Sequence, residues 1–101
     1  MSSSWRPLLQ KNLKELRIHL SQTRPGSQGT REFILKEYAA LKAANPTFPI
    51  LVREAHDVDA RAFARYAFGQ ERKVSLENLS EAEVASRIQS LAESRPSSTE
   101  R

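Results

Sequence analysis

The sequence predicts a single α/β domain, in which a four-stranded mixed sheet carries flanking helices. Three observations lead to this prediction. The 101 residues are enough for one hydrophobic core and too few for two. Segments with alternating apolar and polar residues are interleaved with segments that repeat apolar residues at three- and four-residue spacing. Stretches containing glycine and proline separate these segments, so strands and helices follow one another along the chain.

The first half of the chain predicts a strand, a helix and a second strand. Residues 16–20 (LRIHL) alternate apolar and polar side chains, as a strand with one buried face does. Residues 21–29 (SQTRPGSQG) have the composition of a loop, and apolar residues at helical spacing from Phe33 to Leu41 predict a helix that stops at Asn45-Pro46. The apolar run at residues 50–53 then suits a buried strand that lies parallel to the first.

The second half predicts a hairpin and a helix. Residues 56–62 are ambiguous and compatible with a helical turn. Residues 63–68 (FARYAF) predict a third strand with Tyr66 and Phe68 on one face, where we expect core positions. A turn at residues 69–71 leads into a fourth strand at 74–76, so strands three and four are antiparallel.

The last helix has the clearest start signal in the chain. Ser80 and Glu83 have the spacing of a capping box, and Leu79 with Val84 forms the matching hydrophobic staple. Apolar residues from Val84 to Leu91 then form a stripe that faces the sheet. The resulting element order is that of a thioredoxin-like fold, with a parallel first pair of strands and an antiparallel hairpin.

We expect the two ends to lie outside the domain, which occupies residues 14–93. Residues 1–13 form an N-terminal leader that is basic, rich in serine and free of acidic residues, as mitochondrial import signals are. A leader with only a few hydrophobic contacts fits the composition equally well. Because the first strand begins almost at once, we expect the leader to be retained. Residues 94–101 form a disordered polar tail.

The composition excludes several kinds of reactive, metal-binding and membrane-spanning segments. The chain has no cysteine, which removes disulfides, zinc ribbons, iron–sulfur ligation and thiol nucleophiles. His19 and His56 are the only histidines, and no cluster of carboxylates joins them, so we expect neither a metal site nor a cofactor. No apolar run approaches the roughly 20 residues that span a bilayer. The net charge of +4 is a mild excess, which more often marks a solvated surface than a phosphate-binding one.

Two groups of side chains are candidates for contact with a partner. Arg17 and His19 should project from the polar face of the first strand, with Arg53 beside them on the second. A basic sheet face of this kind suits RNA, an acidic protein surface or solvent.

The second group lies in and beside the loop before the first helix, and consists of Arg24, Ser27, Gln28 and Arg31. Backbone amides at this point bind anions in some proteins, but PGSQG (residues 25–29) matches neither a P-loop nor a dinucleotide fingerprint. Glycines that allow a tight turn into the helix explain the loop better. Ser27 and Gly29 are both possible caps for the helix.

Catalysis is not indicated. Ser21 and the other loop hydroxyls have no base beside them in the sequence except His19, which lies inside the first strand. Residues 50–66 also lack the proline that thioredoxin-like enzymes place before the third strand. We therefore expect no catalytic residue.

Four stretches carry a resemblance to a known family: LRIHL (16–20), PGSQGTREF (25–33), NPTFPILVRE (45–54) and ARYAFGQE (64–71). They resemble the small thioredoxin-like accessory subunits of mitochondrial NADH:ubiquinone oxidoreductase, respiratory complex I, in register from about Leu13 to Leu91. The same domain family includes mitochondrial ribosomal proteins, which makes binding to ribosomal RNA the alternative function.

The resemblance implies a non-catalytic subunit on the matrix arm of complex I, peripheral to the inner membrane on its matrix side. Such a subunit supports assembly or stability of the NADH-oxidising module and contacts the large iron–sulfur subunit. Members of the family often carry one cysteine directly after the first strand and another after the second. Ser21 and Ala55 occupy those positions here, so a thiol switch is absent.

Overall fold

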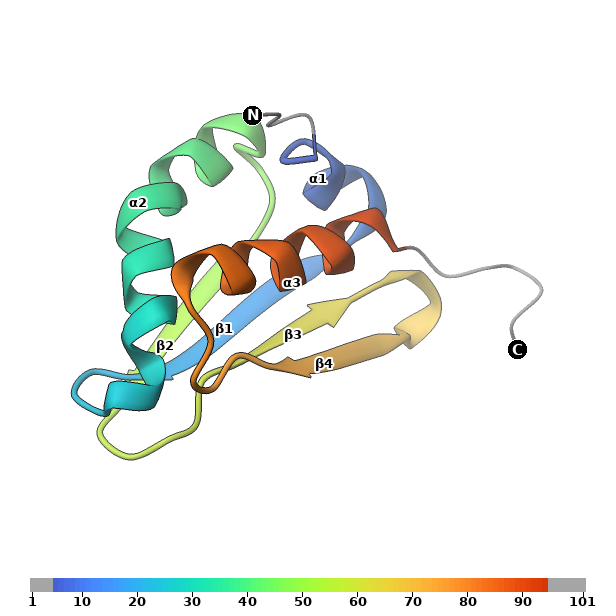
Figure 1. Cartoon of the computed structure of the whole chain (residues 1–101). Coiled ribbons are helices and arrows are strands. Elements are labelled where there is room, and N and C mark those ends of the chain that lie inside the picture. The colour runs from blue at the N-terminus through green and yellow to red at the C-terminus, as the bar shows by residue number, and fades with distance from the viewer. Residues whose placement is uncertain (1–4, 95–101) are drawn as a thin grey trace.

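The structure is a computed structural model that describes residues 5–94 (Figure 1). It contains three α-helices and four strands, with two short 3₁₀ turns at Pro25–Ser27 and Ala67–Gly69. In chain order the elements are α1 (Leu8–Asn12), β1 (Glu15–Ser21), α2 (Gln28–Ala44), β2 (Ile50–Ala55), β3 (Arg61–Arg65), β4 (Glu71–Ser75) and α3 (Glu81–Glu93).

The four strands form one mixed sheet in the order β2-β1-β3-β4. Strand β1 pairs in parallel with β2 and antiparallel with β3, and β3 and β4 form an antiparallel hairpin. This confirms the predicted α/β class, the mixed sheet and the pairing of its strands. The four strands and the two longer helices follow one another in the predicted order, but the helical turn considered for residues 56–62 is absent and a short helix, α1, precedes β1.

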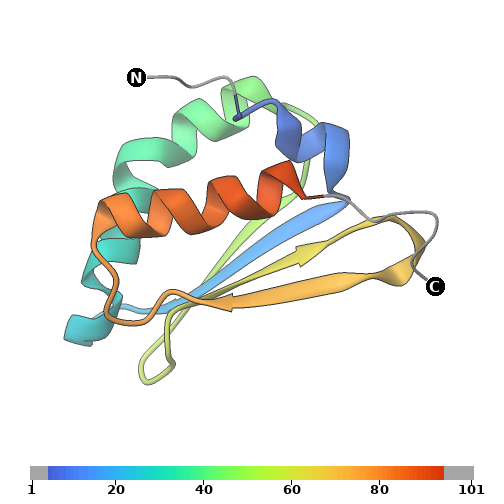
Figure 2. The same ribbon diagram turned by 45° about the vertical axis from the view of Figure 1, so that its right-hand side comes forward.

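All three helices lie on the same side of the sheet, as Figures 1 and 2 show from two directions. The connection from β2 to β3 spans only residues 56–60 and contains no helix, so no element of residues 5–94 covers the opposite side. The domain is therefore a two-layer structure with one sheet face open. Among the described residues, no helix has the length and apolarity needed to cross a membrane.

The core lies between the sheet and the helices. Leu16, Ile18 and Leu20 of β1 point into it, and alanines at 62 and 64 keep β3 close to the helices. Helix α3 contributes Val84, Ile88 and Leu91, which confirms the predicted stripe. Its start is also confirmed, because the Ser80 hydroxyl accepts from the Glu83 N–H and the Glu83 carboxylate accepts from the Ser80 N–H.

The segment from Trp5 to Leu13 is packed into this core. Trp5, Leu9 and Leu13 are all buried, and Leu9 is fully enclosed. The side chain of Asn45, at the C-terminal end of α2, holds the segment in place. Its amide nitrogen donates to the Arg6 carbonyl and its amide oxygen accepts from the Gln10 N–H. An import role for the leader stays a prediction, and residues 1–4 lie outside the described residues, as do residues 95–101 of the predicted tail.

Two expectations about individual strands were wrong. The run at residues 50–53 is not a buried strand, because β2 is an edge strand in which only Ile50 is buried and Leu51 is 42% exposed. The third strand ends at Arg65, so Tyr66 is buried as predicted but Phe68 is 84% exposed. Phe68 lies in the turn between β3 and β4 with a left-handed φ of 65°, which ends the alternation of the strand.

Candidate functional site

The uncovered side of the sheet, which we call the open face, presents three rows of side chains across the strands. Strand alternation puts these side chains opposite the buried ones, and the strand register aligns them. The middle row contains Arg17, Leu51, Phe63 and Lys73. One flanking row contains His19, Arg53, Arg61 and Ser75. The other flanking row contains Glu15, Arg65 and Glu71.

Ion pairs neutralise one end of this face more fully than the other. The Glu15 carboxylate lies 3.5 Å from Arg17 and 3.4 Å from Arg65, and the Glu71 carboxylate lies 2.8 Å from Arg17. No ion pair involves Arg53 or Lys73 among residues 5–94. Both acids of the face are thus engaged at the Arg65 end, and the other end keeps an excess of positive charge.

The centre of the face is a stack of cationic and aromatic groups. The Arg17 guanidinium lies 5.2 Å from the Phe63 ring centroid, within range of a cation–π interaction. The His19 ring lies 4.9 Å from the same ring at an angle of 54°. Partial burial and the positive charges of Arg17, Arg53 and Arg61 lower the pKa of His19 below its ordinary value. The neutral form of the His19 ring is therefore favoured, first by its burial and then by the three arginines around it.

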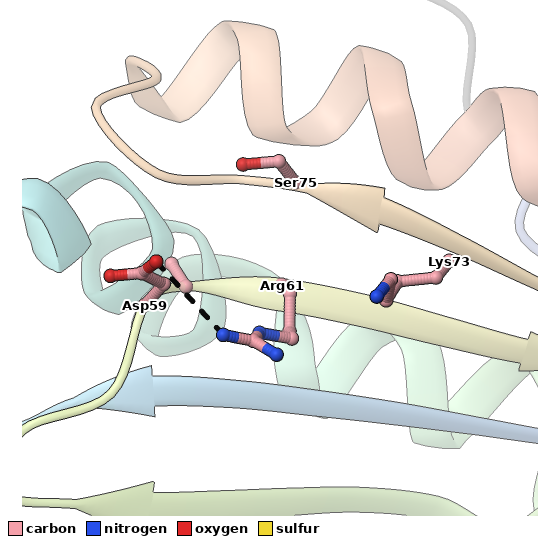
Figure 3. Close-up of a pocket in the computed structure, with 5 residues that line it drawn as sticks. Asp59, Arg61, Lys73 and Ser75 are labelled. Carbon is pink, nitrogen blue, oxygen red and sulfur yellow. Dashed lines mark ion pairs between the residues drawn. The ribbon is translucent and has the colours of Figure 1, made fainter.

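A shallow pocket of about 230 Å³ lies at the end of this face where β3 begins. Figure 3 shows the side chains of Asp59, Arg61, Lys73 and Ser75 that line it. The Asp59 carboxylate is 4.0 Å from Arg61 but 3.3 Å from Arg24, so its charge is shared with a residue outside the pocket. The pocket therefore offers cationic donors that are only partly neutralised.

The structure brings the first group of predicted residues together. Arg17 and His19 lie on the same face of β1, and Arg53 is the register partner of His19 on β2. Four further residues of this face were not predicted from the sequence: Arg61, Phe63, Arg65 and Lys73. The signal was present in RAFAR (residues 61–65), where small apolar residues alternate with large polar or aromatic ones. An expected strand that started two residues too late hid that alternation.

The second predicted group, in the loop before α2, is engaged within the domain. Arg24 forms ion pairs with Asp57 at 3.2 Å, Asp59 at 3.3 Å and Glu77 at 3.4 Å. Glu77 in turn accepts from the Ala60 N–H at 2.7 Å. These contacts tie three loops together at one end of the sheet, so the Arg24 charge is balanced by internal carboxylates.

Arg31 and Ser27 fix the backbone of the same loop. Arg31 donates to the carbonyl oxygens of Ser21 and Arg24 at 2.9 and 3.0 Å. The Ser27 hydroxyl is fully buried and accepts from the Ser21 N–H at 2.9 Å. Ser27 occupies the cap position of α2, but its side chain makes no capping bond. Gln28 is exposed and bonds only to Glu32 on the same helix among the described contacts.

The glycines of this loop serve close packing. Neither Gly26 nor Gly29 has a positive φ. A β-carbon at Gly29 would lie 2.0 Å from the Leu79 carbonyl oxygen, so α2 approaches the β4–α3 loop more closely than any side chain allows. A tight-turn conformation is therefore not what requires glycine at position 29.

Ser21 is not arranged as a nucleophile. It is fully buried, and its hydroxyl donates to the His56 carbonyl and accepts from the N–H groups of Thr23 and Arg24. It is also the register partner of Ala55 on the adjacent strand β2. Among residues 5–94, no group of three or more His, Asp or Glu side chains is placed to hold a metal ion.

Comparison with known proteins identifies the family. Residues 30–81 match the family model of the mitochondrial ribosomal protein L51 / S25 / CI-B8 domain. This range begins in α2 and ends where α3 begins, so it contains β2, β3 and β4 of the sheet.

Three curated relatives cover more of the chain. NADH dehydrogenase [ubiquinone] 1 alpha subcomplex subunit 2 of Mus musculus is 53% identical over 79 residues, which are 78% of this chain and 80% of the relative. The protein of the same name from Arabidopsis thaliana is 43% identical over 91 residues, 90% of this chain and 94% of the relative. The NADH-ubiquinone oxidoreductase 10.5 kDa subunit of Neurospora crassa is 42% identical over 81 residues, 80% of this chain and 86% of the relative. These matches confirm the resemblance drawn from the sequence motifs, and the chain belongs to the L51 / S25 / CI-B8 domain family, in the group of NADH dehydrogenase [ubiquinone] 1 alpha subcomplex subunit 2 sequences.

Proposed function

We propose that the chain is a non-catalytic accessory subunit of mitochondrial NADH:ubiquinone oxidoreductase, respiratory complex I. One observation carries the proposal: relatives from an animal, a plant and a fungus that are 42% to 53% identical are all named as subunits of this enzyme. Each match covers at least 80% of the relative, so the similarity extends over nearly the whole subunit.

In the finer form of the proposal, the subunit is peripheral on the matrix side, in the matrix arm of the complex. There it contacts the large iron–sulfur subunit and supports assembly or stability of the NADH-oxidising module. The architecture supports a scaffold role of this kind. The helices cover one sheet face and leave the other open, which gives a small domain a broad surface for contact with a partner.

The polar groups of the β1–α2 loop support the absence of catalysis. In this loop the Ser21 hydroxyl donates to a backbone carbonyl, and Arg31 donates to two others. A hydroxyl used in this way has no base to remove its proton. The loop thus holds the fold together at the position where a thiol-disulfide enzyme keeps its reactive groups.

The alternative function is that of a mitochondrial ribosomal protein that binds ribosomal RNA. The family name includes ribosomal proteins, and the open face has an excess of basic residues. Two features favour the first function. Arg17 and His19 cover the Phe63 ring, which leaves it unavailable for base stacking, and Glu15 and Glu71 would repel a phosphate backbone.

Native gel electrophoresis tests the proposal. A tagged form of the chain is expressed in cells, and their mitochondria are solubilised gently. We expect the tag to co-migrate with in-gel NADH dehydrogenase activity, and cells that lack the chain to accumulate less of the NADH-oxidising module. Co-migration with ribosomes, in a band that ribonuclease abolishes, would establish the alternative function. Loss of co-migration with the enzyme in every condition would refute the proposal.

A further inference from the structure

We infer that the open face is the docking surface of the chain and that it binds an acidic polypeptide surface, with one carboxylate seated in the Arg61–Lys73–Ser75 pocket. This inference rests on the proposed function, because it names the surface by which the subunit would attach to its complex. Three properties of the open face carry it: an uncompensated charge, a preformed anion pocket and a rigid platform.

The charge excess is the first property. The five basic residues of this face are opposed by Glu15 and Glu71 on the strands and by Asp59, which lies 4.0 Å from Arg61 at the start of β3; the basic residues are Arg17, Arg53, Arg61, Arg65 and Lys73. Both glutamates pair with Arg17 and Glu15 also pairs with Arg65, so their charges are consumed at one end. Burial first, and then the charges of Arg17, Arg53 and Arg61, lower the pKa of His19 on the same face. A partner that supplies carboxylates to the other end would complete the pattern of ion pairs.

The pocket is the second property. Arg61 and Ser75 are direct cross-strand partners, and Lys73 lies one pleat along β4 on the same face. Their side chains line the pocket from two neighbouring strands, as Figure 3 shows. The Ser75 oxygen accepts from the Glu77 N–H, so its own proton is free to be donated. A guanidinium, an ammonium and a hydroxyl thus line the pocket together with the Asp59 carboxylate, whose charge is shared between Arg61 at 4.0 Å and Arg24 at 3.3 Å.

The spacing of the free cations is the third property. Arg53 lies on β2 and Lys73 on β4, with β1 and β3 between them. Three strand spacings separate these strands by about 14 Å. The strands hold the two charges at a fixed distance, so the partner must present carboxylates at a matching distance. Such a requirement gives specificity that a flexible basic tail does not.

An acidic protein suits this face better than a nucleic acid does. The aromatic ring at its centre is already covered by Arg17 and His19, and the two glutamates would meet any phosphate chain that crossed the sheet. A protein partner needs no free aromatic ring. It can also place carboxylates at the basic end of the face and hydrogen-bond donors near Glu71 at the other end.

Paired charge reversals test the inference in the assembled complex. The double variant Arg53→Glu/Lys73→Glu reverses two charges on the open face. The control Lys36→Glu/Arg87→Glu makes the same change in net charge on exposed positions of helices α2 and α3. Both proteins are first compared with the original chain by thermal unfolding, which should differ by no more than a few degrees because all four positions are at the surface.

We expect the open-face variant to lose co-migration with NADH dehydrogenase at least about tenfold and the control to stay within about twofold of the original chain. Equal incorporation of both variants would overturn the docking inference while the proposed function stands. Equal loss of both would also overturn it, since the dependence on charge would not be specific to this face. If the original chain itself does not co-migrate, the proposed function fails. Ribosomal co-migration that only the open-face variant loses would assign the face to RNA.

Discussion

The two faces of the sheet differ in how their side chains are satisfied. On the covered face, Leu16, Ile18 and Leu20 are enclosed by three helices and a packed N-terminal segment. On the open face, the alternate residues of the same strand, Arg17 and His19, remain half-buried among charges that are only partly balanced. In β1, alternate residues therefore serve different purposes: those on the covered face pack the core, and those on the open face are available for contact with a partner.

Four basic residues follow the same division. Arg24 and Arg31 contact carboxylates and carbonyls of their own domain, and their loss should act on folding. Arg53 and Lys73 have no ion-pair partner among residues 5–94, and their loss should act on binding. The following predictions test this division, beginning with the covered side.

Replacement of Leu9 by alanine should have the largest effect on stability. Leu9 is fully buried in the segment that joins α1 to the core, so its truncation removes apolar contact and leaves a cavity. We expect a loss of about 3 kcal/mol in the free energy of unfolding, measured by chemical denaturation. Leu35→Ala is the matched control, because Leu35 is 88% exposed and should change stability by less than about 0.5 kcal/mol. Equal small effects would mean that the segment is not part of the covered layer.

Gly29→Ala should be nearly as severe. The added methyl group would lie 2.0 Å from the Leu79 carbonyl oxygen, so α2 and the β4–α3 loop must separate. We expect a loss of about 2 kcal/mol, seen as a lower midpoint in thermal unfolding. Gly69→Ala provides the contrast. The φ of 74° at this position would strain an alanine backbone, but no atom lies within 4 Å of the added methyl group. A wild-type midpoint for Gly29→Ala would show that the close approach has been overestimated.

Arg31→Ala and Arg53→Ala separate the two kinds of arginine. Arg31 donates to two backbone carbonyls, and its removal should cost about 1–2 kcal/mol of folding free energy. Arg53 is exposed on the edge strand, and its removal should change stability by less than about 0.5 kcal/mol. Urea denaturation of the two variants measures both quantities. The division between the two groups fails if the order is reversed.

The pH dependence of His19 should give the smallest effect. Burial first, and then the charges of Arg17, Arg53 and Arg61, lower its pKa in the folded state below the ordinary value of 6.5. The unfolded chain therefore takes up this proton first, and stability falls as the pH drops from about 6.5 toward the lower folded pKa. NMR titration of the His19 ring measures that pKa directly. Arg53→Gln should raise it toward 6.5, whereas Lys36→Gln, on the helix layer, should leave it unchanged.

Much of the fold was predictable because its signals are local. The capping box at Ser80, the alternation from Leu16 to Leu20 and the stop at Asn45 each depend on a few neighbouring residues, and the structure confirms all three. The burial of β2 was not predictable in this way. An apolar run suits both a central and an edge strand, and only the sheet order shows that β2 lies at the edge.

The candidate site was predictable only in part. Alternation placed Arg17 and His19 on one face, but the cross-strand neighbours Arg61 and Lys73 depend on the register of β3 and β4. The internal roles of Arg24 and Arg31 depend on loops that meet from distant parts of the chain. No local sequence pattern distinguishes an arginine that bonds to backbone carbonyls of its own domain from one that is available to bind a partner.

Differential acetylation of lysines in intact complex I tests the central claim, that the chain attaches by its open face. Lys73 lines the pocket on that face, and Lys36 is an exposed residue of α2 whose ammonium lies 3.3 Å from Glu81 at the start of α3. The reactivity of each lysine toward acetic anhydride is measured by mass spectrometry in the free chain and in the purified complex. We predict that Lys73 is protected in the complex while Lys36 keeps the reactivity it has in the free chain. Protection of Lys36 with full reactivity at Lys73 would contradict the account.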